Sequence, residues 1–297
     1  MSLLLEVSGV PYTGFTTCGA KKSMENAAGT FSFCASGETP MNCPIKENSA
    51  CRVLVDGEGV INGFVERVEP YDDANGYYLQ IAGRDRTCDF VDSSVPVNIE
   101  YSAGGQLKRI AERVLAAQGI TGVKVIDKVG VLAPFKAGEV LAGAIGETGF
   151  AFVERYCRKR QVLLTCDGSG NIVLTRASST LIKTMLIREQ DGANNNILHS
   201  HGMTDSSGRF RKISVWSQTN PSAEDTLTDV GINASASDTA IRNTRQLIVP
   251  AESAMNLMTA AQRAKWEVNI RRARATTYDC TVAGFKAQAD GTIWKPN

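Results

Sequence analysis

The stretch from Tyr77 to Asp92, YYLQIAGRDRTCDFVD, places the strongest constraint on how this chain can fold. Apolar residues occupy every second position from Tyr77 to Ile81, which is the period of a half-buried strand. Gly83 follows and permits backbone conformations that other residues resist. The pattern therefore predicts a strand that runs directly into a charged turn.

The charged turn is dense in side chains of opposite sign, namely Arg84, Asp85, Arg86, Asp89 and Asp92. Arginine forks and carboxylates form paired hydrogen bonds that can pin a turn without taking part in chemistry. A metal site or an acid/base site is the alternative, but the neighbouring sequence has no histidine, no second carboxylate cluster and no glycine-rich phosphate loop. We predict a structural turn formed by Gly83, Arg84, Asp85, Arg86 and Asp89.

Composition narrows the class of protein. The 297 residues are 43% apolar and 21% charged, which is ordinary for a globular chain with two or three cores. The 32 basic and 31 acidic residues leave a net charge of +1, which argues against sequence-specific nucleic-acid binding. The opening MSLLLEVSGV has too short an apolar run for a signal peptide, so we expect a soluble chain without stable membrane association.

The cysteines favour a reducing compartment. They are Cys18, Cys34, Cys43, Cys51, Cys88, Cys157, Cys166 and Cys280. None forms a C-x-x-C pair, and several lie within apolar strand patterns. We predict reduced, mostly buried thiols and no disulfide, which suits assembly in a reducing cytoplasm.

Residues 1–95 read as a small all-β domain. Short strand patterns such as LLLEV, FSFCA and YYLQIAG are separated by turn residues, and Asp56-Gly57 and Asn75-Gly76 are hairpin signals. The segment 38–48 contains two prolines and is expected to be an exposed loop.

Residues 96–178 read as a compact α/β domain. Helical spacing of apolar residues predicts one helix within 102–119 and another over 147–160, with a short strand, VKVIDKVGV, between them. QVLLTC, DGSGN and IVLTRA are the first strand, the turn and the second strand of a predicted β-hairpin.

Residues 179–297 return to β character, in TLIKTMLI, FRKISVWSQ, TRQLIVP and TYDCTVAGF. The polar stretch 219–238 is expected to be an exposed loop. The longest helical pattern covers 252–275, just after Pro250. Its arginines, Arg263, Arg271, Arg272 and Arg274, are expected to face solvent or a partner.

No motif predicts catalysis. His199 and His201 form an H-x-H pair on one side of a strand, but a third metal ligand is missing locally. Gly168-Ser169-Gly170 fits a hairpin turn and not a nucleophile elbow, and 143–146 lacks the strand that precedes a nucleotide-binding loop. We predict no catalytic residue, no cofactor and no bound metal.

Short motifs spread along most of the chain point to a family. They are the strand end Ala82–Thr87, the helix start Gly146–Thr148, the hairpin VLLTCDGSGNIVLTRA, the strand Arg209–Gln218, Arg242 and Arg245 before LIVPAE, the arginine-rich helix and the closing DGTIWKPN. In this order they resemble the landmarks of baseplate hub proteins of contractile-tailed bacteriophages, the phage Mu hub and late control protein family. Arg211-Lys212-Ile213 departs from the more polar Ser-Glu-Tyr of that family.

The resemblance implies an α+β, multidomain fold, with two small, tail-tube-like β-barrel domains flanking the α/β helix-hairpin insertion. It implies a homotrimeric ring that adapts the sixfold tail tube to the threefold central spike and lines the channel for DNA ejection. The implied partners are the tail tube, central spike, tape measure and baseplate wedge proteins. The implied location is the tail baseplate of the virion, after assembly in the host cytoplasm. A hub with peptidoglycan hydrolase or carbohydrate-binding activity and a type VI secretion spike-hub component are the alternatives.

The third region is short of strands for a barrel. After the long helix only TYDCTVAGF and a short run at Trp294 remain, whereas a small barrel needs about five or more strands. We expect the natural polypeptide to continue past Asn297, or a neighbouring subunit to complete the sheet.

Overall fold

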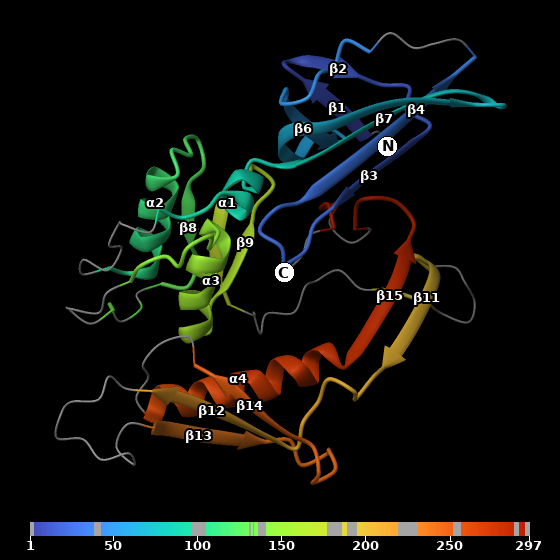
Figure 1. Cartoon of the computed structure of the whole chain (residues 1–297). Coiled ribbons are helices and arrows are strands. Elements are labelled where there is room, and N and C mark those ends of the chain that lie inside the picture. Colours follow the sequence, from blue (N-terminus) through green and yellow to red (C-terminus); the bar gives the residue numbers. More distant parts are fainter. Residues whose placement is uncertain are drawn as a thin grey trace. The chain divides into compact units, whose positions relative to one another are not determined.

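The structure, a computed structural model, forms two compact units (Figure 1). It describes residues 3–38, 43–96, 105–130, 132, 134–135, 141–176, 186–188, 195–218, 231–251, 257–287 and 291–294. The first unit comprises 1–157, 162–183 and 284–297, and the second comprises 158–161 and 184–283.

A seven-stranded antiparallel sheet forms the N-terminal part of the first unit. Its strands are β1 Leu3–Val7, β2 Val10–Tyr12, β3 Thr17–Lys21, β4 Thr30–Gly37, β5 Ala50–Val55, β6 Glu58–Asp73 and β7 Gly76–Asp85. They lie in the order β2-β1-β5-β6-β7-β4-β3. Among the described residues the edge strands β2 and β3 are not paired with each other, so the sheet stays open there.

Alternating apolar residues bury one face of this sheet. The most deeply buried side chains are Leu5, Phe33, Val53, Ile61, Val65 and Ile81. The hairpin predicted at Asp56-Gly57 is confirmed, and both residues have the positive φ, 48° and 86°, that a tight two-residue turn of this kind requires. The second predicted hairpin is confirmed as well, although its turn lies one residue earlier, because Gly76 already pairs with Asp73.

The segment predicted as an exposed loop at 38–48 is only partly exposed. Ile45 is 5% exposed and joins the core of the first sheet, because an isoleucine gains free energy by leaving water even within a loop. Residues 39–42 lie outside the described residues.

The rest of the first unit is mainly a helix-hairpin region. It contains α1 Cys88–Asp92, α2 Leu107–Ala117, β8 Val125–Asp127, α3 Gly149–Lys159, β9 Leu163–Cys166 and β10 Ile172–Thr175. The strand order is β8-β10-β9, with β10 parallel to β8 and antiparallel to β9. The two long helices and the hairpin predicted here are confirmed. Phe90 of α1 belongs to the same core as Ile110 and Phe152, so this core begins directly after β7.

The start of α3 follows from its sequence. Thr148 precedes the helix, and its hydroxyl Oγ1 accepts a hydrogen bond from the Ala151 N–H at 3.2 Å, as an N-cap does. Glu147 Oε2 accepts hydrogen bonds from the Ala144 N–H and from Arg155 Nη2, both at 2.9 Å. These bonds hold the helix start against the preceding loop.

The second unit contains two small sheets and the long helix α4 Leu257–Arg274. Strands β11 Ile197–Thr204 and β15 Thr276–Val282 form an antiparallel pair. The strands β12 Lys212–Gln218, β13 Gly231–Ser237 and β14 Gln246–Pro250 lie in the order β13-β12-β14. Figure 1 shows α4 lying across this sheet, and its contacts are with β12 and β13. Their shared core includes Val215, Ala260 and Ala264.

Strand β13 corrects the prediction of a loop across 219–238. Its sequence, GINASAS, places Ile232, Ala234 and Ala236 on the half-buried face against the core of α4, and polar residues on the other face. Because two of the three inward positions are alanine, the alternation is too weakly apolar to stand out in the sequence. Residues 219–230 lie outside the described residues, as does 180–185 of the predicted strand TLIKTMLI.

The structure is a mixed α+β fold rich in sheet, which confirms the predicted class at this level. Within the described part of the second unit, the five strands form two separate sheets and not one closed barrel.

Ala264→Leu is expected to lower the free energy of unfolding by about 1–3 kcal/mol, because Ala264 is fully buried against the sheet and the larger side chain overpacks that core. Urea unfolding measures the change. Ala273→Leu, at an exposed position of the same helix, is the matched control and should change stability by less than about 0.5 kcal/mol. Equal stability of the two variants would contradict the close packing of α4 on β12 and β13.

Candidate functional site

The charged segment is mainly strand, which corrects the predicted turn. Strand β7 continues to Asp85, and at Arg84 it is flanked by β4 on one side and β6 on the other. Because both neighbours hydrogen-bond to it, the backbone stays extended through the charged residues. Only residues 86–87 form a turn, and Asp89 lies in α1.

A glycine is required at position 83 because no side chain fits there, and not because the backbone turns. A Cβ atom at this position would lie 2.0 Å from the Phe64 carbonyl oxygen and 2.7 Å from Cζ of Phe31. Any side chain would therefore collide with β6 and with the core of the sheet.

The Asp85 carboxylate lies at the centre of a buried group of donors. Oδ2 accepts the Gly29 N–H at 2.8 Å, and Oδ1 accepts the Asn62 N–H at 3.3 Å. Lys22 Nζ lies 3.6 Å from Oδ2, and the Cys166 thiol donates to the same oxygen at 3.4 Å. We call these five residues the Asp85 cluster. Asp85 is 0% exposed, so these donors replace the water that a carboxylate would otherwise bind.

The Asp85 cluster joins the first sheet to the hairpin β9–β10. Lys22 Nζ also donates to the Asp167 carbonyl oxygen at 2.6 Å, and Asn62 Nδ2 donates to the Ser169 carbonyl oxygen at 3.0 Å. Gly170 has a φ of +79°, and a Cβ there would lie 2.7 Å from the Asn62 carbonyl oxygen. The glycine-rich turn therefore lets the hairpin approach the end of the sheet.

The hairpin turn has its own internal support. Asp167 Oδ1 accepts hydrogen bonds from the N–H groups of Ser169 and Asn171 at 2.8 and 2.9 Å. Aspartate favours turns because its short side chain can bond to the backbone ahead of it. These hydrogen bonds stabilise the turn without any contribution from the sheet.

Arg84 forms a second link on the other face of β7. Its Nε and Nη2 donate to the two carboxylate oxygens of Glu66, both at 2.7 Å, and Nη2 also donates to Asp92 of α1 at 2.5 Å. These two acids hold the pKa of Arg84 above its usual range. The register of β6 shifts between Val65 and Arg67, so Glu66 is the extra residue of a β-bulge. A bulge redirects a side chain, and here it places Glu66 against the guanidinium.

Three thiols of the first unit are held in the protonated form. Burial raises the pKa of the Cys166 thiol to about 11 and that of the Cys51 and Cys88 thiols to about 12, so all three stay protonated at neutral pH. All eight cysteines are free, three of them buried and one, Cys18, exposed. In the part of the chain that the structure describes, no group of three or more His, Cys, Asp or Glu side chains gathers to hold a metal.

His199 and His201 lie on β11 opposite Thr281 and Asp279 of β15. Both are exposed. They share one side of the strand, as the sequence predicts, because side chains two apart point the same way.

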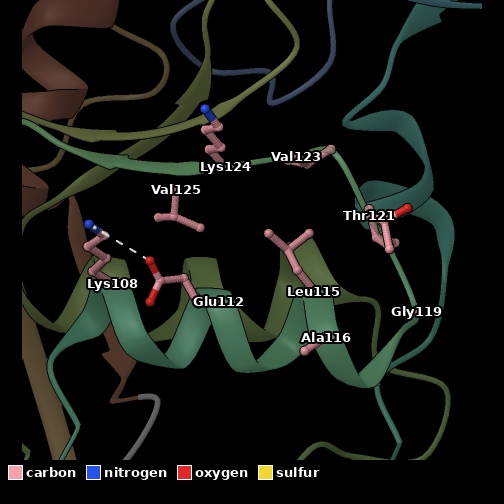
Figure 2. A pocket seen from close by; sticks show the side chains of 10 residues that line it. Lys108, Glu112, Leu115, Ala116, Gly119, Thr121, Val123, Lys124 and Val125 are labelled. Atoms are coloured by element: carbon pink, nitrogen blue, oxygen red, sulfur yellow. Dashed lines mark ion pairs between the residues drawn. The ribbon is translucent and has the colours of Figure 1, made fainter.

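A shallow groove of about 660 Å³ lies between α2 and the segment that leads into β8 (Figure 2). It is lined by Lys108, Glu112, Leu115, Ala116, Gly119, Ile120, Thr121, Val123, Lys124 and Val125. Its one carboxylate, Glu112, is paired with Lys108 at 3.8 Å, as Figure 2 shows. No histidine, no cysteine and no second carboxylate is among the residues that line it, so the lining offers no acid/base pair.

Arg263 corrects the prediction that the arginines of α4 face solvent. Its side chain is 2% exposed, it pairs with Glu267 at 2.9 Å, and its guanidinium stacks over the Trp266 ring at 4.5 Å. The sequence held one signal for this ion pair. Arg263 and Glu267 are four residues apart, and side chains at that spacing meet on a helix. Arg272 and Arg274 are exposed, as predicted.

Two family models match consecutive parts of the chain. The first describes the N-terminal domain of Mu phage baseplate assembly protein GpP-like proteins and matches residues 2–85. The second describes the second domain of baseplate hub protein gp44-like proteins and matches residues 87–176. The baseplate hub protein gp44 of Escherichia phage Mu is 25% identical over 308 residues, which cover 100% of this chain and 77% of that protein.

Solved structures give the same result. The 43 kDa tail protein of prophage MuSo2 from Shewanella oneidensis is 29% identical, with a TM-score of 0.80 over 99% of this chain and 85% of that one. The tail protein from Neisseria meningitidis MC58 is 19% identical with a TM-score of 0.79, over 99% and 83%. An Escherichia coli component of the type VI secretion system is 12% identical with a TM-score of 0.51, over 78% and 73%. The last two show a likeness of fold alone.

The fold and the two matched family models define a structural protein of a bacteriophage tail. More narrowly, the chain belongs to the baseplate hub family of contractile-tailed phages that includes the phage Mu hub. The resemblance seen in the sequence is thereby confirmed. The two family models meet at Arg86, directly beside the Asp85 cluster. None of the described helices is long and apolar enough to cross a membrane.

Asp85→Asn tests the charge of the buried carboxylate. Burial raises the pKa of Asp85 above its ordinary value of 3.8, although Lys22 and the N–H donors lower it. The folded protein therefore binds this proton more tightly than the unfolded chain does. The contribution of Asp85 to the free energy of unfolding should therefore fall as pH rises from 3.8 through the raised pKa. The asparagine variant lacks this dependence, so its stability relative to wild type should increase with pH across that window.

Urea unfolding of both proteins in steps from about pH 4 to pH 7 measures this difference. The comparison is internal, because every other titrating group is shared by the two proteins. A variant that instead loses stability relative to wild type as pH rises would show that Lys22 and the N–H donors outweigh burial.

Arg84→Ala is expected to lower the free energy of unfolding by about 1–2 kcal/mol, because the fork to Glu66 and Asp92 is lost while its surroundings are partly exposed. Arg84→Lys should recover only part of this, since lysine has no planar fork. Arg67→Ala, which removes an exposed pair with Glu69, is the control and should change stability by less than about 0.5 kcal/mol. Equal melting temperatures of Arg84→Ala and the control would contradict the structural role that we predict for this segment.

Proposed function

We propose that this hub protein works as a homotrimeric ring that adapts the sixfold tail tube to the threefold central spike. The observation that carries the proposal is the match to the phage Mu hub along the whole chain. Three copies with two β-rich regions each present six similar units on the side of the tube, while the ring itself keeps threefold symmetry.

The domain division that this function needs is 1–95, 96–178 and 179–297, with the first and third regions as barrel domains. The open sheet of the first region and the two small sheets of the second unit support it, because their edge strands offer unpaired backbone groups. In the ring, strands of a neighbouring copy or further strands of the chain would close the barrels. Gly83, Arg84, Asp85, Arg86 and Asp89 would keep the first barrel joined to the helix-hairpin insertion.

The ring would enclose a channel for the tape measure protein and for DNA during ejection. A net charge of +1 supports this role, because a strongly basic lining would retain DNA by releasing its counterions. The remaining surfaces would contact the tail tube, the central spike and the baseplate wedge proteins. The protein would assemble in the host cytoplasm and reside in the tail baseplate of the virion.

A hub with peptidoglycan hydrolase or carbohydrate-binding activity is less favoured. The described acidic groups are bound by arginine, lysine or backbone donors at the sites above, and hydrolysis of a glycosidic bond needs a pair of free carboxyl groups. A type VI secretion role is also less favoured, because the likeness to that component is one of fold alone, whereas the phage hub matches in sequence.

The purified chain is expected to be a trimer, with a mass in multi-angle light scattering three times the 31.9 kDa of one copy. In images of the tail, three copies should lie between the tube and the central spike. A monomer or a closed dimer, both in solution and in the particle, would rule out the ring. A wall-degradation assay on the same protein gives the test for enzymatic activity.

A further inference from the structure

The hairpin β6–β7 ends in an exposed acidic tip. Glu69, Asp72 and Asp73 are all exposed there, and Glu69 is paired with Arg67 at 3.5 Å. Tyr71 is 44% exposed and stacks on Tyr78, with ring centroids 4.9 Å apart. We call Glu69, Tyr71, Asp72 and Asp73 the acidic tip.

The acidic tip lies on an open strand edge. Strand β5 pairs with β6 only as far as Phe64, so among the described residues the later part of β6 has a neighbour on one side alone. Charges on such an edge oppose pairing with unsuitable strands. A partner for this edge has to bring opposite charge.

The second unit carries the opposite charge in one place. Two arginines, Arg245 and Arg271, contact the Phe210 ring, and two more, Arg209 and Arg272, share the carboxylate of Asp238. The guanidinium groups of Arg245 and Arg271 lie over the Phe210 ring, 4.9 and 5.4 Å from its centroid. Arg209 and Arg272 both bind Asp238, at 2.6 and 3.2 Å. We call these four arginines and Phe210 the arginine cluster.

The arginine cluster keeps an excess of positive charge. Together with Arg263 its four arginines are five cations, and the carboxylates nearby are Asp205, Asp238 and Glu267, so two positive charges are in excess. The whole chain has a net charge of only +1. The side chain of Arg272 is 52% exposed and that of Arg271 is 32% exposed, so both can reach a partner.

We propose that the acidic tip of one copy of this chain docks on the arginine cluster of the next copy. The two surfaces have opposite charge, and each holds an aromatic ring; aromatic residues and arginine are the residue types enriched in protein interfaces. Because the two surfaces differ, the contact is head-to-tail, and it is the type of contact from which rings of identical copies are built when the rotation closes. The inference rests on the proposed homotrimer and names the surfaces by which its copies meet.

A second copy fits the arginine cluster better than a nucleic acid does. DNA bound there would leave the acidic tip without a partner. The small net charge of the chain also gives no field to attract a phosphate backbone.

Charge reversal tests the contact. Asp72→Arg with Asp73→Arg, and separately Arg271→Glu with Arg272→Glu, should each raise the concentration at which the trimer dissociates by about tenfold or more, because like charges then face each other. All four substitutions in one chain restore opposite charge and should recover most of the affinity. Glu47→Arg with Glu112→Arg, at exposed positions outside the tip, makes the same change in net charge and should leave the trimer intact.

Cross-linking shows that the contact joins two copies. One protein carries Asp72→Cys and a size tag, the other carries Arg272→Cys, and both carry Cys18→Ser to remove the exposed native thiol. After mixing and mild oxidation, a disulfide between the tagged and the untagged chain should appear on a non-reducing gel. A contact within one chain cannot give this product, so its absence, with trimers formed, would overturn the inference.

The outcomes separate the inference from the proposed function. A wild-type trimer that survives both charge reversals overturns the inference and leaves the homotrimer standing. A wild-type chain that is monomeric in solution and in the particle removes both. Loss of duplex DNA binding by Arg271→Glu with Arg272→Glu, without any effect on the trimer, assigns the cluster to nucleic acid and overturns the inference. Circular dichroism and melting temperature check that each variant is folded.

Discussion

The buried carboxylate of Asp85 is the interaction on which the first unit depends. A buried charge without partners costs several kcal/mol, so its donors have to arrive together as the chain folds. Gly29 and Asn62 supply backbone N–H groups, while Lys22 and Cys166 supply side chains from either end of the unit. The cluster lies where the two matched family domains meet, so the same charge that completes the first sheet also fixes the hairpin of the next region against it.

Adjacent residues on a strand point to opposite faces, and β7 uses this at its end. Asp85 points to the buried side and gathers the hairpin β9–β10. Arg84 points to the other side and binds Glu66 of β6 and Asp92 of α1. One short charged sequence therefore links the sheet to the segments that follow it on both faces. Clustered opposite charges in a strand end have a structural explanation here without any catalytic requirement.

The sequence predicted the elements with a strong period or a specific turn signal, such as α2, α3 and the hairpins at 56–57 and 167–171. It could not predict the partners of Asp85, because Lys22 and Cys166 are far from it in the chain and no local pattern links them. The pairing of Glu66 with Arg84 could not be predicted for a different reason. A β-bulge shifts the strand register that the hairpin turn would otherwise set. Burial of Arg263 was missed because charge was taken to mean exposure, although a stacked and paired arginine can be buried.

The net charge of the chain was less informative than the distribution of its charged side chains. A value of +1 argued against a nucleic-acid binder, yet the same chain holds an exposed tip rich in acidic residues and several arginines beside Phe210. In a ring of identical copies, each chain carries both of the surfaces that meet in a head-to-tail contact. Complementary surfaces then have to balance within one sequence, so a total near zero is expected even where local charge is strong. For the proposed ring, near-neutrality of the whole chain is compatible with strong local charge and does not indicate a surface without electrostatic function.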